Sequence, residues 1–385
     1  MPDGTQQACR WERFRELMPV TRKWAYFDNA AVGPLPTPTR DAVLRWADEG
    51  WQDGDTLWPQ WAAGIEQTRR TAAAMIAGST EEIALIPNTT TGIGLVAEGY
   101  PWCEGDNIVT LANEFPSNLY PWMNLASRGV ETRLVPVDGV SPDLNRVLET
   151  CDELTRIIAI SWVGYANGYR IDVGEVVKAA HERGILVLLD AIQGLGVFPL
   201  NVQDTNIDFL AADGHKWMLG PEGAGILYVR RDHLQTLRPL NVGWNSVVHK
   251  YDYSRIELNL RDTAARYEGG SQNMVGLLGL GASLNLLSAC GVGPNESAVG
   301  DRVLEISDFA CQRLREVGAK VSGDRSAVHR SGIVAFDMPR QDLVALRQRC
   351  LENGVVLSHR ADRLRISPHA YCNEDDVERL ITNLL

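Results

Sequence analysis

The sequence has few of the features that define several large protein classes. Its seven cysteines are odd in number and widely spaced, and no Cys-x-x-Cys pair occurs. They are residues 9, 103, 151, 290, 311, 350 and 372. Neither a disulfide framework nor a zinc or other metal site is therefore indicated. Such cysteine usage is typical of a reduced, cytoplasmic setting.

Long apolar runs and an excess of positive charge are also lacking. No stretch of about 18 apolar residues occurs, and the first residues contain no apolar core of the signal-peptide kind. Neither a spanning helix nor a secretory signal is expected. The formal net charge is -12, whereas phosphate backbones are bound by basic faces. We therefore expect neither a nucleic-acid nor a membrane partner.

Short apolar runs alternate with helix-like stretches between residues 83 and 230. Several runs are nearly continuous, as in strands that are buried on both faces of a sheet. The runs are 83–87, 107–112, 132–137, 156–161, 185–190, 207–212 and 225–230. This rhythm predicts an α/β fold with a mostly parallel, seven-stranded sheet. The last two runs are linked too tightly for a parallel crossover, so one strand should be antiparallel.

The pattern changes after 291–295. A helix-like run at 301–318, an apolar run at 331–338 and further short runs near the C-terminus predict a small α+β part. A helix-like segment at 11–18 is expected to pack on it. We predict a large domain over 21–290, and a small domain made of 1–20 and 291–385.

Ligands of such sheets bind beyond the carboxyl ends of the strands. Asp190 ends one apolar run, and Asn88 begins a Thr-Thr-Thr-Gly segment after another. A helix start of this kind offers hydroxyls and N–H groups to an anion. Taken separately, each feature is also explained by an ordinary helix N-cap. At Asp190, Gln193 three residues later could complete a capping box.

A lysine, Lys216, follows the run 207–212 within the segment DGHKWMLGPEGAG. Burial lowers the pKa of an amine, and a neutral amine attacks an aldehyde. The alternative is an exposed loop lysine between turn glycines. Pyridoxal 5'-phosphate (PLP) has an aldehyde for the amine, a phosphate for the helix start and a ring nitrogen for the carboxylate. One ligand thus accounts for all three features.

The chain resembles the class V aminotransferase family of PLP-dependent enzymes, fold type I, which includes cysteine desulfurases, isopenicillin-N-epimerase-like proteins and kynureninases. The similarity extends over nearly the whole chain and is most specific where Asp-x-x-Gln is followed by His-Lys. It is carried by the segments YFDNAAVGPLP, NTTTGI, NEFPSNLYPW, LLDAIQGLG, DGHKWMLGPEGAGILYVR, YEGGSQN and LRISPHAYCN. The resemblance implies fold type I with a smaller second domain and PLP as cofactor.

It also implies roles around the cofactor ring. Lys216 is similar to the lysine that binds the aldehyde and later moves protons, and Asp190 to the partner of the ring nitrogen. Gln193 matches the donor to the ring hydroxyl. Phe115 stands where desulfurases stack a histidine; it can stack but cannot carry a proton. An ordinary core aromatic is the alternative for Phe115.

The resemblance further implies a phosphate site. Thr89 and Thr90 match the phosphate-binding threonines, with Asn88 in place of the usual glycine. His215 is expected near the phosphate. Asp213 stands where many relatives have a serine, and because an acid repels a phosphate it is expected to turn away or to bind through its backbone.

Substrate and partner contacts complete the expected site. Arg365 matches the arginine that holds the substrate carboxylate, and an exposed strand charge is its alternative. Asn29 and Tyr165 are expected at the substrate, although Trp162 and Tyr165 stand where desulfurases have His and Asn. Ser271 matches a residue that reaches the phosphate of the second subunit, which implies a homodimer with shared active sites.

The largest departure lies near the C-terminus. Desulfurases carry a nucleophilic cysteine ahead of the carboxylate arginine, but VVLSHRADRLRIS has none. A persulfide-forming desulfurase is therefore not expected. Ser358, His359 and Arg360 occupy this region, either as contacts to a substrate side chain or as solvated turn residues.

We therefore expect a C–S β-lyase that acts on a cysteine-derived amino acid. A class V aminotransferase or an amino-acid epimerase is the next hypothesis, because both share the first proton removal. A nicotinamide-dependent oxidoreductase is a remote alternative, suggested by the Gly-x-Gly-x-x-Ala pattern at 92–97 with Glu114 beyond it. A non-catalytic binding protein would leave Asp190, Gln193 and Lys216 unexplained.

Overall fold

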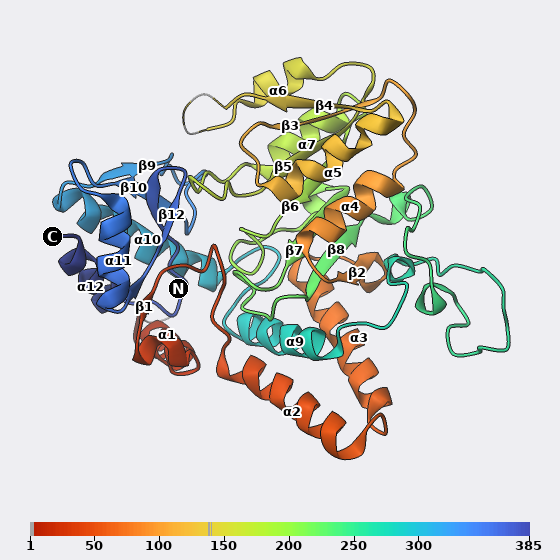
Figure 1. Ribbon diagram of the computed structural model, residues 1–385, viewed down its shortest axis with the longest axis horizontal. Helices are drawn as coiled ribbons and strands as arrows, with labels where there is room; N and C mark the ends of the chain where they lie inside the picture. The colour runs from red at the N-terminus through yellow and green to blue at the C-terminus, as the bar shows by residue number, and fades with distance from the viewer. Residues whose placement is uncertain (1–3, 138, 140) are drawn as a thin grey trace.

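The computed structural model describes residues 4–137, 139 and 141–385. Its centre is a seven-stranded sheet of order β2-β8-β7-β6-β5-β3-β4 (Figure 1). The strands are β2 (Ile83–Ile86), β3 (Asn107–Leu111), β4 (Glu131–Val135), β5 (Thr155–Ser161), β6 (Leu186–Asp190), β7 (Phe209–Asp213) and β8 (Gly225–Val229). All pairs from β4 to β7 are parallel, and β8 is antiparallel to both its neighbours. The predicted α/β fold and its reversed strand are confirmed.

Both faces of the sheet are apolar, because successive residues along each strand pack into two different hydrophobic cores, one on each side. Along β2, Ala84 and Ile86 belong to one core, whereas Ile83 and Leu85 belong to the other. The other strands divide in the same manner, since successive side chains point to opposite faces. This explains the nearly continuous apolar runs of the sequence.

Helices cover both faces of the sheet. Residues of α4 and α5 share one core, while those of α3, α7 and α9 share the other. The helices of this part are α2 (Thr37–Asp53), α3 (Trp58–Met75), α4 (Thr89–Gly99), α5 (Tyr120–Met123), α6 (Leu144–Thr150), α7 (Val173–His181), α8 (Val202–Thr205) and α9 (Met274–Ala289). Short 3-10 helices span Pro19–Arg22, Thr80–Glu82, Pro116–Asn118, Asn124–Arg128, Arg231–His233, Trp244–Ser246 and Ala264–Tyr267.

A second, four-stranded sheet of order β12-β13-β10-β9 lies at one end of the molecule (Figure 1). Its strands are β9 (Lys320–Ser322), β10 (Val334–Asp337), β12 (Ser358–Arg360) and β13 (Arg363–Ile366). Helices α10 (Ala298–Glu316), α11 (Leu343–Glu352) and α12 (Glu374–Leu384) surround it. A parallel pair, β1 (Ala25–Tyr26) with β11 (Val355–Val356), joins the N-terminal region to this part.

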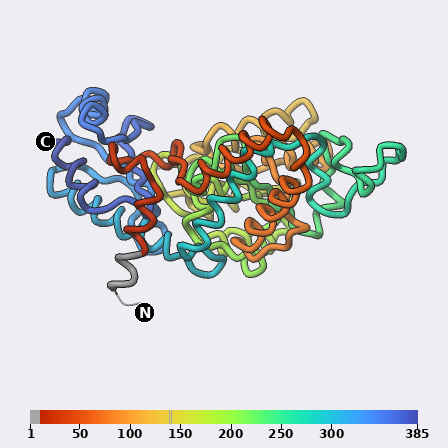
Figure 2. The backbone as a smooth tube through the Cα atoms, turned by 90° about the horizontal axis from the view of Figure 1, so that it is seen from below, coloured from red at the N-terminus to blue at the C-terminus, as the bar shows by residue number. Residues whose placement is uncertain are grey.

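The first helix, α1 (Gly4–Glu16), contacts the C-terminal part of the chain. Arg15 Nη1 lies 2.6 Å from Asp376 Oδ2, and the Phe14 ring packs against His369 and Tyr371. Figure 2 shows α1 beside the small sheet, while segment 242–258 projects from the opposite end. Within the described residues, no helix combines the length and apolar character needed to cross a bilayer.

Helix α4 approaches the sheet closely at Gly92. A Cβ atom at this position would lie 2.7 Å from Ile86 Cδ1 and 2.8 Å from Ala211 Cβ. Gly94, two residues later, has nothing within 4 Å of the equivalent point. The glycine at 92 thus sets the distance between the helix and the strand ends below it.

These two glycines form a matched pair for a stability test. We expect Gly92→Ala to lower the free energy of unfolding by about 1–3 kcal/mol, because the added methyl overpacks the helix–sheet contact. Gly94→Ala should instead raise it by up to about 1 kcal/mol through helix propensity. Urea unfolding followed by circular dichroism measures both, and equal effects of the two variants would contradict the packing argument.

Candidate active site

Polar groups gather where the parallel strands end. Asp190 is the last residue of β6 and Asp213 the last of β7, while Glu114 follows β3. Lys216 lies three residues beyond β7 and is 9% exposed. Because neighbouring parallel strands end at the same edge of the sheet, one short edge carries an amine and three carboxyl groups.

The amine of Lys216 is largely removed from water. Burial lowers its pKa to about 8, and the nearby Asp190 carboxylate partly opposes this effect. The positive charges of Arg365 and Arg360 lower the pKa further. Nζ lies 5.6 Å from the centroid of the Phe115 ring. The alternative of an exposed loop lysine is wrong.

The backbone around Lys216 is held by distant segments. Gly33 N donates to His215 O at 2.7 Å, and a Cβ atom at Gly33 would lie 2.2 Å from Lys216 O. The buried His369 ring contacts Trp217 O through Nε2 at 3.2 Å. Burial lowers the pKa of His369 to about 4, so this ring is neutral and serves as an internal prop.

Asp190 and Gln193 lie side by side beneath this loop. Asp190 is buried, which raises its pKa to about 6, and its Oδ1 accepts from Ile192 N at 3.2 Å. Gln193 accepts from Trp217 Nε1 at 2.8 Å and donates to Ala30 O at 3.0 Å. The carboxyl group of Asp190 is therefore buried in the site near Lys216. Gln193 holds the loop that carries Lys216 through its hydrogen bond with Trp217.

Glu114 is a buried acid whose part in the site the sequence did not reveal. Burial raises its pKa to about 7, and the Asp190 charge acts in the same direction. Ser161 donates to it through N at 2.8 Å and through its hydroxyl. The sequence signals were its place three residues beyond β3, in the pair Glu114-Phe115, and its spacing from the glycines at 92–97, which suggested a different cofactor.

The helix start at α4 has the features of an anion site. Asn88 caps the helix by accepting from Thr91 N at 2.9 Å. Thr89 Oγ1 accepts from Asp213 N at 2.9 Å, and Thr90 donates to Ser117 Oγ at 2.8 Å. The threonines predicted to bind phosphate thus lie at a capped N-terminus next to the end of β7.

Asp213 faces His215 instead of standing alone. Its Oδ2 lies 2.9 Å from His215 Nδ1. Its Oδ1 is buried and lacks a hydrogen-bond partner among the described residues. Asp213 Oδ2 is thus directed to the imidazole of the next residue but one, and Asp213 meets the start of α4 through its backbone N–H.

Arg365 is buried at 2% exposure, so the alternative of an exposed strand charge is wrong. Its Nη1 donates to Tyr165 O at 2.7 Å, and its Nη2 lies 3.2 Å from Asp28 Oδ1. Ser358 also donates to Asp28. Arg365 Nε is buried and has no partner in the described part of the chain. The guanidinium is thus buried, with its two Nη groups bound to Tyr165 and Asp28.

The remaining expected residues differ in their surroundings. Phe115 is 43% exposed and meets Tyr165 edge-on, with centroids 5.3 Å apart, so it is not an ordinary core aromatic. Asn29 is fully buried, donates to Ser367 O at 2.8 Å and accepts from Tyr371 at 3.0 Å. These contacts favour a structural role for Asn29, and its substrate contact stays a prediction.

Ser271 does not lie with the other predicted residues. It is exposed on the loop before α9 and lines a separate cleft of about 340 Å³ with Trp58, Trp244 and Tyr251. The glycines of the remote dinucleotide alternative also lie elsewhere than expected, inside α4 and not at a strand–helix turn. That pattern therefore lacks the geometry of a dinucleotide fingerprint.

The groups at the strand ends fit PLP. A buried amine with a lowered pKa, Lys216, suits the aldehyde, and a buried acid, Asp190, suits the ring nitrogen. The capped start of α4 suits the phosphate. The unpartnered donor of Arg365 suits a substrate carboxylate.

Comparison with known proteins supports this assignment. The sequence model of the family "Aminotransferase class-V" matches residues 25–380. A probable cysteine desulfurase of Methanothermobacter thermautotrophicus is 34% identical over 288 residues, covering 74% of this chain and 71% of the relative. The apo structure of a cysteine desulfurase from Thermococcus onnurineus superposes with a TM-score of 0.86 at 26% identity, covering 96% of both chains.

A third similarity concerns the fold alone. The cystine C–S lyase C-DES, solved in complex with its product cysteine persulfide, gives a TM-score of 0.88 at 24% identity, covering 95% of this chain and 98% of the other. The match over most of the sequence and the agreement in fold lead to one assignment. The chain belongs to the class V aminotransferase family and is a PLP-dependent enzyme of fold type I.

Proposed function

We propose that this enzyme is a C–S β-lyase that acts on a cysteine-derived amino acid without a persulfide-forming cysteine. The proposal rests on one observation. The segment ahead of Arg365 forms a short β12–β13 hairpin without cysteine, and Ser358 ties it to Asp28. The relatives that are named cysteine desulfurases support a sulfur-containing amino acid as substrate.

The two cysteines that flank the hairpin in sequence are poorly suited to act as nucleophiles. Cys350 is fully buried, and burial raises the pKa of its thiol to about 11. Cys372 is also buried, which raises its pKa, and its Sγ contacts Tyr26 O at 3.4 Å. Since the thiolate is the reactive form, neither side chain favours sulfur transfer.

The proposed roles follow from the positions of the side chains. Bound PLP supplies an aldehyde for the substrate amine and a ring that withdraws electrons from Cα. Lys216 Nζ then takes the Cα proton, for which a pKa of about 8 is suitable. Asp190 holds a proton on the ring nitrogen, and Arg365 holds the substrate carboxylate. Phe115 would stack on the cofactor ring, and it cannot transfer a proton.

The atoms of the proposed reaction balance simply. The Cα–H and Cβ–S bonds break, and the sulfur leaves with a proton as a thiol. The remaining unsaturated amine takes up water and yields pyruvate and ammonium. No group of the enzyme has to accept sulfur, which agrees with the absence of cysteine from the β12–β13 hairpin.

We further propose that the enzyme is a homodimer in which Ser271 reaches the phosphate of the partner subunit. Ser271 is exposed and lies in a cleft apart from the strand-end residues. The neighbouring segment 242–258 exposes large apolar side chains, with Ile256 at 91% and Leu258 at 75%. Exposed apolar groups of this kind favour an interface.

Product analysis tests the function directly. Incubation with L-cystine and a panel of cysteine S-conjugates should release pyruvate and a thiol or persulfide in equal amounts. A keto acid that retains its sulfur, with formation of the pyridoxamine cofactor, would instead indicate amino transfer. Deuterium entering Cα from D₂O without any keto acid would indicate epimerisation. Absence of both pyruvate and thiol across the panel would refute the lyase proposal.

The lowered pKa of Lys216 predicts how the apoenzyme takes up its cofactor. Only the neutral amine attacks the aldehyde, and with a pKa of about 8 its fraction rises as the pH rises. The rate of PLP capture, followed by absorbance, should increase about tenfold between pH 7 and pH 9. Lys178→Ala, at an exposed lysine on α7, should retain this profile. Lys216→Ala should lose covalent capture, and a flat profile in the native enzyme would contradict the role of burial.

Arg365→Lys tests the carboxylate contact. A lysine cannot reproduce the planar fork, so kcat/KM for the substrate should fall roughly tenfold to a hundredfold. Arg363→Lys, an exposed position on the same strand, is the matched control and should change kcat/KM less than about twofold. Equal kinetics for the two variants would argue against Arg365 as the carboxylate site.

A further inference from the structure

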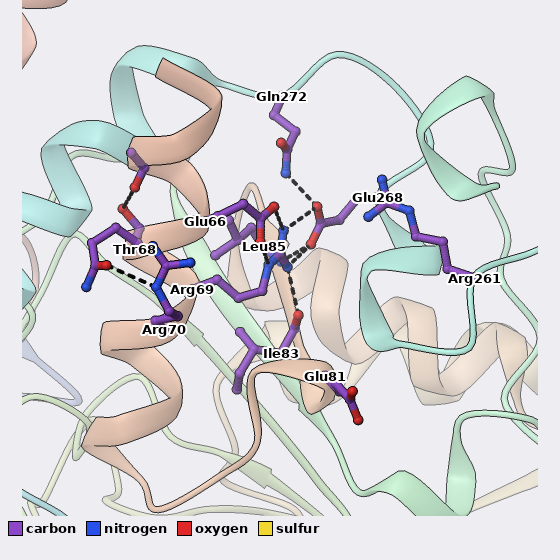
Figure 3. Close-up of polar contacts among 12 residues, drawn as sticks. Glu66, Thr68, Arg69, Arg70, Glu81, Ile83, Leu85, Arg261, Glu268 and Gln272 are labelled. Carbon is purple, nitrogen blue, oxygen red and sulfur yellow. Dashed lines mark hydrogen bonds and ion pairs between the residues drawn. The ribbon is translucent and has the colours of Figure 1, made fainter. Parts of the chain in front are cut away.

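A buried ion pair links helix α3 to the loop that carries Ser271. Arg69 is 3% exposed, and its guanidinium faces the Glu268 carboxylate with two hydrogen bonds, the one from Nη2 at 3.0 Å (Figure 3). Nη1 also donates to Ile83 O at 2.8 Å. Glu66 accepts from Nε at 3.1 Å and from Nη2 at 3.2 Å. All five N–H donors of Arg69 are thus used.

Glu268 is equally well satisfied. One of its oxygens accepts from Leu85 N at 2.8 Å, and the other accepts from Gln272 Nε2 at 2.6 Å (Figure 3). Glu268 and Gln272 therefore close the loop 268–272 on itself. Ser271 lies between them in the chain and is exposed, and no hydrogen bond of its hydroxyl occurs within the described residues.

The same loop is fixed from its other side by close backbone contact. A Cβ atom at Gly269 would lie 1.6 Å from Asn241 O. Asn245 N donates to Gly269 O at 3.2 Å. The loop is thus clamped between the ion pair and segment 241–245, with its serine left free.

The ion pair also holds the edge of the large sheet. Ile83 O and Leu85 N belong to β2, the edge strand, and point away from β8. An edge strand has unpaired backbone groups that need partners. Two residues beyond β2, Asn88 starts the helix of Thr89 and Thr90. One ion pair therefore braces both the strand that leads to this subunit's phosphate site and the loop proposed for its partner's.

We propose that Arg69, Glu268 and Gln272 are positioning residues that fix Ser271 toward the cofactor phosphate of the partner subunit. This inference rests on the proposed shared active site. It predicts that the affinity for PLP depends on a buried ion pair that itself does not touch the cofactor. The three residues act as a unit, so their effect should disappear when Ser271 is absent.

The test measures the dissociation constant of PLP from the apoenzyme by titration, together with the ³¹P NMR shift of the bound phosphate. Ser271→Ala should raise the dissociation constant about tenfold, since one hydrogen bond to a charged group is lost. Glu268→Gln should give a comparable rise and move the ³¹P signal in the same direction. The double variant, Ser271→Ala with Glu268→Gln, should bind PLP no more than about threefold more weakly than either single variant.

Glu66→Gln is the matched control. It removes the other carboxylate that contacts the same guanidinium, but from helix α3 itself; Glu66 lines the cleft of Ser271, yet among the described residues it has no hydrogen bond to loop 268–272. The PLP dissociation constant of this variant should stay within about twofold of the native value. A loss of affinity as large as that of Glu268→Gln would show that only the charge around Arg69 matters, and would overturn the positioning role.

Because Glu268→Gln removes a buried charge, it can prevent folding. A second variant therefore leaves both charges of the ion pair in place. Gln272→Leu breaks the clamp on Glu268 without altering the ion pair, and should raise the dissociation constant about threefold. If Glu268→Gln lowers stability in urea while neither it nor Gln272→Leu changes PLP affinity, the pair is merely structural and the inference fails. If Ser271→Ala itself leaves the affinity unchanged, the shared-site proposal fails as well, which separates the two failures.

Discussion

The chemistry proposed for this enzyme depends on keeping the Lys216 amine out of water. Lys216 is nearly buried, and its surroundings lower its pKa to about 8, so the neutral form is accessible near physiological pH. An exposed lysine would stay charged and inert. Every neighbouring contact serves this placement, because Gly33, Trp217 and His369 fix the loop against which the side chain extends.

The burial of an amine at the end of a sheet also determines its neighbours. Three carboxyl groups, those of Asp190, Glu114 and Asp213, share the same edge and would repel one another without cations between them. Lys216 lies near Asp190, and His215 faces Asp213. Glu114 accepts hydrogen bonds from Ser161, and burial raises its pKa to about 7. Each of the three acids thus has a different environment.

The sequence predicted what depends on short-range order. Apolar runs located the strands, and residues at or just beyond a strand end, such as Asp190 and Lys216, could be assigned to one edge. Contacts between residues that are far apart in the chain could not be predicted from the sequence. The pairing of Arg365 with Asp28 joins residues 337 positions apart, and that of Arg69 with Glu268 joins residues 199 positions apart. Neither periodicity nor spacing encodes such pairs, so the buried state of Arg365 and the bracing of the Ser271 loop emerged only from the fold.

The short stretch from Phe27 to Gly33 has a mechanical consequence. It forms a bridge with Ser367 beside the small sheet at one end and bonds to the backbone of His215 at the other. The same short stretch of backbone thus contacts both the small sheet and the loop that holds the lysine. Seven residues of turn backbone therefore tie the edge of the C-terminal part directly to the loop that carries Lys216, so the position of the amine is set by both parts of the chain at once.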